Sequence, residues 1–160
     1  MVHIIAFSSF FAFCLLISLR YGGAPERVAM LAQATAAALT IAAIFFVPHL
    51  ASFRKLAAAL FVIDVGLCVT LTIIALRANR LWTIVLAGLQ LSTVIAHLSK
   101  ALFPALPAAS YGIFAQFWAW PMLVTTLIGT LQHRSRCRQS GREPNWRPLW
   151  PHSVQSGSTA

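Results

Sequence analysis

Acidic residues are almost missing from this chain of 160 residues, which contains only three, Glu26, Asp64 and Glu143. Charged residues of both signs make up 9% of the sequence, whereas an ordinary soluble domain has about 25%. Hydrophobic residues make up 59%, and a soluble fold of this size must expose a large share of its residues to water. The composition therefore argues against a soluble globular domain and favours an integral membrane protein.

Familiar catalytic and cofactor motifs are also missing. The sequence contains no glycine-rich phosphate loop, no GxSxG or HExxH motif, and no acids spaced DxxxD or ExxE. Its 3 cysteines are an odd number and include no CxxC pair, so they predict neither a disulfide framework nor a thiolate metal site. An enzymatic activity is left open but is not favoured, and we predict no metal and no cofactor.

What the sequence does contain is a series of apolar stretches separated by charged residues, glycine and proline. They cover approximately residues 3–19, 28–47, 56–76, 81–98 and 110–131. Each is close to the ~20 residues that an α-helix needs to cross the hydrocarbon core. Strands are excluded because the stretches do not alternate and an open sheet edge cannot face lipid. We therefore predict an all-α, polytopic bundle of about five transmembrane helices in residues 1–131.

The basic residues predict the orientation of this bundle. With the N-terminus outside and the C-terminus in the cytoplasm, all but three of the 12 Lys and Arg residues lie on the cytoplasmic side. The three on the outer side are Arg54, Lys55 and Lys100, and the reverse topology inverts the ratio. We predict a multi-pass protein of a cell inner membrane.

Residues 132–160 have a different composition, rich in arginine, proline, serine and glycine, and include Trp146 and Trp150. Such a segment buries too little apolar area to fold alone, so we predict a disordered cytoplasmic tail. We expect its first arginines, Arg134, Arg136 and Arg138, to contact anionic lipid headgroups at about 1 kcal/mol each. A protein-docking role for the Trp-Pro run is the alternative. The net charge of +9 does not predict nucleic acid as a partner, because no domain-sized soluble part presents a basic face.

Asp64 is the one acid deep inside an apolar stretch. A charged residue in the bilayer centre costs roughly 2.5 to 3.5 kcal/mol on insertion scales and usually faces the bundle interior. Counting residues back from the turns at either end of the stretch places Thr40 and Thr93 at the depth of Asp64, and Gln116 near that depth on the last stretch.

On the fourth stretch, Gln90, Thr93 and His97 are spaced i, i+3 and i+7, so they share one helix face. We therefore predict an intramembrane polar site made of Asp64, Gln90, Thr93, His97 and Gln116. The alternative is a structural layer of hydrogen bonds that holds the helices in register, at about 1 kcal/mol for each side chain.

Other residues predict packing or a cofactor. Ala34, Ala38 and Ala42 recur every four residues, which lets helices approach closely, and we expect them in the core or in a homodimer contact. Trp82 fits the cytoplasmic aromatic belt. Three histidines, His3, His49 and His97, fall near the outer ends of the helices, where facing histidines are able to hold haem or a metal.

The sequence resembles no family whose activity is transferable, and it favours a non-enzymatic function. We expect an accessory or assembly subunit that associates with itself or with a larger membrane complex. The first alternative is a small oligomeric proton-coupled transporter that uses Asp64. The second is a haem- or ligand-binding redox membrane protein that uses the outer histidines.

Overall fold

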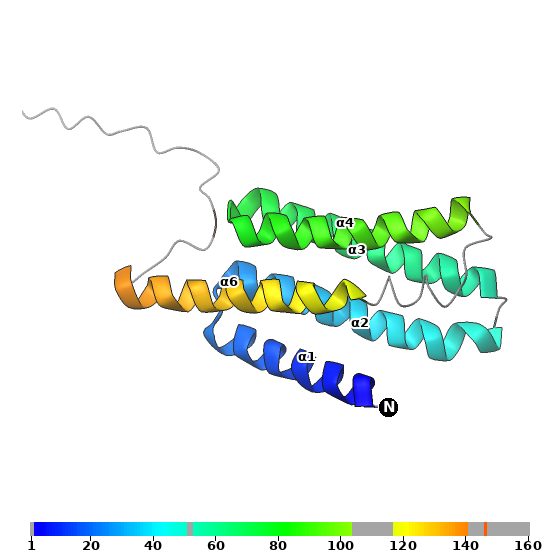
Figure 1. The fold of residues 1–160 in the computed structure, drawn as a ribbon, viewed down its shortest axis with the longest axis horizontal. Coiled ribbons are helices and arrows are strands. Elements are labelled where there is room, and N and C mark those ends of the chain that lie inside the picture. Colours follow the sequence, from blue (N-terminus) through cyan, green and yellow to red (C-terminus); the bar gives the residue numbers. More distant parts are fainter. Residues whose placement is uncertain (1, 51–52, 104–116, 141–145, 147–160) are drawn as a thin grey trace, which may run out of the picture.

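The computed structural model describes residues 2–50, 53–103, 117–140 and 146. All regular structure in these ranges is α-helical (Figure 1). The helices are α1 (Val2–Tyr21), α2 (Ala24–Leu50), α3 (Phe53–Ala78), α4 (Leu81–Leu102) and α6 (Ala119–Ser140). The prediction of an all-α chain is therefore confirmed.

Four of the helices, α1 to α4, contain stretches of 20 to 24 residues that are long and apolar enough to cross a membrane. A helix of 20 residues spans about 30 Å, which is the thickness of the hydrocarbon core. Part of the fifth predicted crossing, residues 110–116, lies outside the described residues. The fifth crossing and the orientation of the bundle stay predictions.

The helices extend past the borders that the charged residues suggested. The first turn of α2 contains Pro25 and Glu26, and the last turn of α3 contains Arg77. Long charged side chains at a helix end are able to reach water while the backbone stays helical. Helix α6 likewise continues through Arg134 and Arg136 to Ser140. Residues 132–140 are therefore helical, although they belong to the segment predicted to be disordered.

Short turns connect neighbouring helices. Asn79 separates α3 from α4 with a φ of 51°, a left-handed conformation that asparagine tolerates better than most residues. Between α1 and α2, a Cβ on Gly22 would lie 2.5 Å from the carbonyl oxygen of Ser18 and 2.9 Å from Cβ of Glu26. A glycine is therefore required where α2 turns back along α1.

The five described helices run side by side (Figure 1). Around the bundle, α1 packs on α2, α2 on α3, α3 on α4, and α4 on α6. Helix α6 then closes the ring against α1 and also contacts α2. This arrangement places α6 where polar side chains of α1 and α2 reach it.

Trp82 corrects the prediction of an aromatic belt residue. Its side chain is buried, with 5% exposure, in a cluster that includes Leu71, Leu86 and Met122. It packs directly over Gly129 of α6, where an added Cβ would come within 2.6 Å of the indole ring. The small residue on α6 makes room for the large one on α4, so Trp82 is a core residue rather than a headgroup contact.

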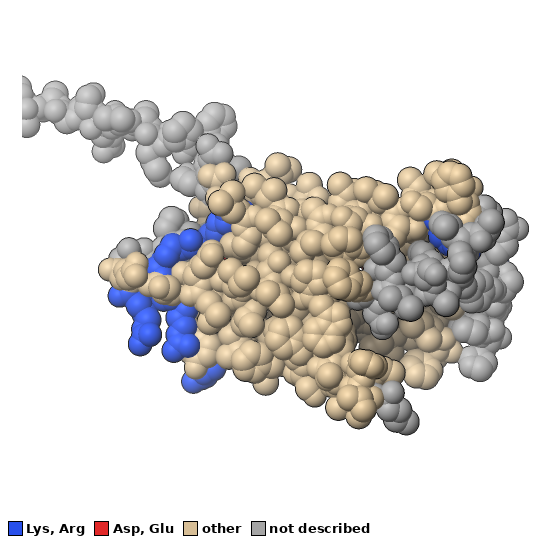
Figure 2. Space-filling view, in the orientation of Figure 1, with Lys and Arg blue, Asp and Glu red and all other residues tan. Residues whose placement is uncertain are grey.

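The basic residues gather at one end of the bundle, the end where α6 finishes (Figure 2). Arg20, Arg77 and Arg138 lie in the last turns of α1, α3 and α6. Arg80 lies at the start of α4 at the same end. We call this the basic end. The opposite end carries Lys100 in the last turn of α4.

Candidate functional site

Asp64 of α3 is held by two side chains of α4. Nε2 of His97 lies 2.8 Å from one carboxylate oxygen, and Nε2 of Gln90 donates to the other at 3.0 Å. The same Gln90 nitrogen is 3.1 Å from the backbone carbonyl oxygen of Asp64. The side chain of His97 is 9% exposed and that of Asp64 is 23% exposed. The carboxylate is therefore paired, yet it is not completely enclosed.

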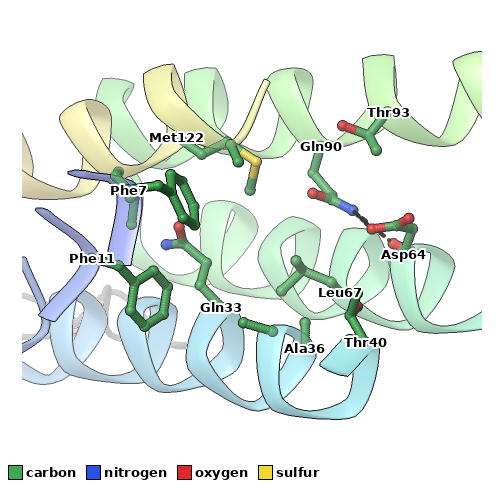
Figure 3. Close-up of a pocket in the computed structure, with 13 residues that line it drawn as sticks. Phe7, Phe11, Gln33, Ala36, Thr40, Asp64, Leu67, Gln90, Thr93 and Met122 are labelled. Atoms are coloured by element: carbon green, nitrogen blue, oxygen red, sulfur yellow. Dashed lines mark hydrogen bonds between the residues drawn. The ribbon is translucent and has the colours of Figure 1, made fainter. Parts of the chain in front are cut away.

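A cavity of about 150 Å³, partly open to its surroundings, adjoins this cluster between the helices (Figure 3). Its lining comes from all five described helices. Its aromatic residues are Phe7 and Phe11 of α1, and Met122 and Leu67 add apolar surface. The polar lining residues are Gln33 and Thr40 of α2, Asp64 of α3, and Gln90 and Thr93 of α4.

Two amide oxygens at this cavity are uncommitted. Nε2 of Gln33 donates a hydrogen bond to Thr126, and Nε2 of Gln90 donates one to Asp64. Within the described part of the chain, Oε1 of neither glutamine accepts a hydrogen bond. In Figure 3, the side-chain oxygen of Gln90 points away from Asp64, toward the side of Met122.

The two hydroxyl groups at the cavity are uncommitted as well. Elsewhere in the bundle, helical hydroxyls such as those of Thr70, Thr72 and Ser99 donate to the carbonyl oxygen four residues earlier. Among the described residues, Thr40 and Thr93 form no such bond. The cavity therefore presents two amide oxygens and two hydroxyls with unused hydrogen-bonding capacity.

A second polar region lies between the cavity and the basic end. Nε2 of Gln33 donates to Oγ1 of Thr126 at 2.8 Å, and the hydroxyls of Ser18 and Thr130 lie 3.0 Å apart. Thr126 and Thr130 also donate to the carbonyl oxygens of Met122 and Thr126. We call these four residues, Ser18, Gln33, Thr126 and Thr130, the polar seam. It joins α6 to α1 and α2.

A buried ion pair lies at the basic end. Nη1 of Arg80 is 2.7 Å from Oε1 of Glu26, and the Glu26 side chain is completely buried. This pair connects the first turn of α2 to the turn between α3 and α4. Within the described residues the second carboxylate oxygen of Glu26 has no hydrogen-bond partner, so Arg80 supplies the main compensation for this buried charge.

The structure brings four of the five predicted site residues together. Gln90 and His97 both contact Asp64, and Thr93 lines the adjoining cavity. The fifth, Gln116, lies outside the described residues. Gln33 also lines the cavity but was not among the predicted site residues. Like Gln90, it is an amide inside an apolar stretch, and that position could have identified it.

The remaining predicted contacts are dispersed. Arg134 lies over the ring of Tyr21, with 4.2 Å between its guanidinium carbon and the ring centroid, and Arg138 lies in the last turn of α6. Of the three histidines proposed for haem or a metal, His97 faces Asp64, His3 is exposed on α1, and the side chain of His49 lies outside the description. In the described ranges no three His, Cys, Asp or Glu residues gather as a metal site.

No protein-family model, curated protein or solved structure matches this chain. The described residues define a class, a helical protein in which four helices are long and apolar enough to cross a membrane.

Proposed function

We propose that this protein is a small proton-linked membrane carrier in which Asp64 and His97 form the proton-binding pair. The observation that carries the proposal is the contact of 2.8 Å between the carboxylate and the imidazole, beside a cavity lined by all five described helices. Carboxylate and histidine side chains inside membrane segments typically serve proton relays or substrate sites.

The pair is suited to hold one exchangeable proton. Its negative carboxylate and basic imidazole share a short contact, so the proton has an acceptor on either side. When the proton leaves, a negative charge stays in a region of low dielectric, which is costly unless another positive charge replaces it. Because Asp64 also lines the cavity, a solute in the cavity is close enough to compensate that charge.

A purely structural role for the cluster explains less of the geometry. A structural layer of hydrogen bonds stabilises a bundle by satisfying its polar groups. At this cavity Thr40, Thr93 and the two amide oxygens keep unused capacity, as described above. That capacity supports a binding role.

The membrane topology is part of the proposal. We propose five crossings of a cell inner membrane, with the N-terminus outside and the basic end in the cytoplasm. The gathering of arginines at one end of the bundle supports this orientation (Figure 2). We also propose that Arg134, Arg136 and Arg138 contact anionic headgroups there.

Solute-driven proton flux in proteoliposomes tests the carrier function. Proteoliposomes of the wild type, loaded with a pH-indicator dye, are exposed to gradients of single solutes, including amines, amino acids, sugars and carboxylates. We expect one solute class to change the luminal pH beyond the change seen in protein-free liposomes, and we expect Asp64→Asn to lose this effect while gel filtration and circular dichroism stay unchanged. The matched control is Thr72→Val, because Thr72 is exposed and its hydroxyl donates to its own helix at Cys68. A proton flux that Asp64→Asn leaves intact contradicts the proposal.

A second candidate function is the accessory or assembly subunit that the sequence favoured. One observation supports it: on α2, Ala38 is exposed and its neighbours Ala34 and Ala42 are only partly covered. Small residues let another helix approach closely. Purification in mild detergent followed by mass spectrometry tests this candidate, which predicts a partner at fixed stoichiometry that Ala38→Leu removes. The absorption spectrum of the same sample tests haem, since haem predicts a Soret band.

A further inference from the structure

We infer that the cavity binds a small monovalent cation of the ammonium type, which exchanges for the proton of the Asp64–His97 pair. This inference deepens the proposed carrier function by naming its substrate class, and it rests on the same site.

The first argument is the chemistry of the uncommitted groups. The cavity side of the site offers the amide oxygens of Gln33 and Gln90, the hydroxyl oxygens of Thr40 and Thr93, and the nearby carboxylate of Asp64. The amide nitrogens of both glutamines are already occupied. Amide and carboxylate oxygens only accept hydrogen bonds, so this lining selects a ligand that donates several of them. An ammonium group is such a ligand.

The second argument is charge. Among the described lining residues, Asp64 is the one titratable group, and His97 faces it from α4. The described lining residues of α1, α2 and α6 add no titratable side chain. One carboxylate compensates one positive charge, so the site suits a monovalent cation. In a low dielectric the site holds either the proton or the cation, because two positive charges there repel strongly.

The exchange balances without any covalent step. An ammonium cation enters the cavity and donates hydrogen bonds to the amide and hydroxyl oxygens, while its charge compensates Asp64. One proton leaves the Asp64–His97 pair. The net charge of the site is unchanged, so the cation and the proton compete.

The third argument is size and shape. The volume of about 150 Å³ corresponds to roughly five water molecules at the ~30 Å³ that each occupies in the liquid. It accepts ammonium or a short primary amine and leaves space for water. Phe7 and Phe11 line the cavity, and aromatic rings favour ammonium groups through cation–π attraction.

Proton release on cation binding tests the inference. Purified wild-type protein in weakly buffered detergent solution, with a pH-indicator dye, is titrated with methylammonium chloride. The parallel arms are sodium chloride, which carries charge without N–H donors, and tetramethylammonium chloride, which has the charge and a fitting size but no N–H group. We expect saturable proton release with methylammonium and none with the two controls. Release that is equal in all three arms is an ionic-strength effect and overturns the inference.

Variants connect the release to the cavity. Asp64→Asn should abolish the proton release. Thr93→Val, which keeps the ion pair, should weaken methylammonium binding roughly tenfold or more, as expected when one hydrogen bond to a charged group is lost. Thr72→Val should bind like the wild type. If Asp64→Asn does not fold, Thr93→Val alone decides, and unchanged binding in Thr93→Val overturns the inference.

The failure of this inference is distinguishable from the failure of the carrier function. Proton flux driven by another solute class, with no binding of methylammonium, overturns the substrate class and leaves the carrier intact. Saturable methylammonium binding with proton release, but no proton flux driven by any solute in proteoliposomes, supports the ammonium site and contradicts transport.

Discussion

Two polar regions lie inside this bundle, and they use their hydrogen bonds differently. In the polar seam, Thr126 and Thr130 each donate to a backbone carbonyl and receive a contact from Gln33 or Ser18. All four seam residues have at most 6% exposure. At the cavity, Thr40 and Thr93 keep their hydroxyls uncommitted within the described structure, beside the pair of Asp64 and His97.

The difference separates polar groups that hold a membrane bundle together from polar groups that bind something. A satisfied side chain has no capacity left for a ligand, whereas an uncommitted one facing a cavity does. Gln33 belongs to both regions, because its nitrogen is bonded in the seam and its oxygen belongs to the cavity lining. The following substitutions either break or sharpen this comparison.

The largest effect is expected at the buried ion pair of the basic end. Arg80→Ala leaves the completely buried Glu26 without its partner, and breaking a buried pair typically costs about 3–5 kcal/mol. The free energy of unfolding in mixed micelles measures this loss. Arg77→Ala is the matched control, since Arg77 lies in the same region but is exposed. Equal stability of the two variants would show that the ion pair is dispensable.

A smaller loss is expected where α4 and α6 approach. Gly129→Ala forces the ring of Trp82 to move, because the new Cβ would lie within 2.6 Å of it, and overpacking costs about 1–3 kcal/mol. Gly88→Ala is the control, because an added Cβ there meets no atom within 4 Å. Thermal unfolding in detergent should place Gly129→Ala below the wild type and Gly88→Ala at or above it. If Gly88→Ala were the less stable variant, the packing of Trp82 on Gly129 would be contradicted.

The next prediction separates the two polar regions directly. Thr130→Val removes the hydroxyl that contacts Ser18 and should lower the stability by about 1 kcal/mol without changing methylammonium binding, because neither Ser18 nor Thr130 lines the cavity. Thr93→Val should weaken methylammonium binding with little change in stability, because the Thr93 hydroxyl makes no hydrogen bond among the described residues. Calorimetric titration and unfolding curves on both variants provide the test. If both variants change methylammonium binding and stability to the same extent, the two polar regions do not differ in role.

The smallest effect on stability is expected at the surface, where the change concerns lipid binding. Replacing Arg134, Arg136 and Arg138 together by glutamine should reduce the retention of anionic phospholipid, by about 1 kcal/mol for each arginine. Native mass spectrometry measures the bound phosphatidylglycerol. Lys55→Gln at the opposite end is the control, and it should retain lipid like the wild type. If the triple variant and Lys55→Gln retain the same amount of lipid, these arginines do not bind anionic headgroups.

Much of the fold could be predicted from the sequence because lipid imposes a simple length rule. Apolar stretches near the thickness of the bilayer are helices, and the very short turn at Asn79 fixes the register of α3 against α4. Because of that register, counting residues from the turn placed Thr93 at the depth of Asp64. The helical spacing then placed Gln90 and His97 on the same face as Thr93.

The contacts that escaped prediction depend on which helix face turns inward. In lipid, apolar residues cover both the inner and the outer faces, so hydrophobic periodicity does not mark the interior. The sequence therefore does not show that Trp82 faces Gly129. The bond from Gln33 to Thr126 and the one from Arg80 to Glu26 join residues 93 and 54 positions apart. Only the packing of α6 and the turn after α3 brings these partners together.

The most direct test of the account is methylammonium-driven proton flux in dye-loaded proteoliposomes, measured against protein-free liposomes on the wild type, Asp64→Asn and Thr130→Val at equal amounts of folded protein. The account predicts that Asp64→Asn loses the flux and that Thr130→Val keeps it despite its lower stability. A flux that survives in Asp64→Asn, or that disappears equally in both variants, would contradict the assignment of the cavity as the working site.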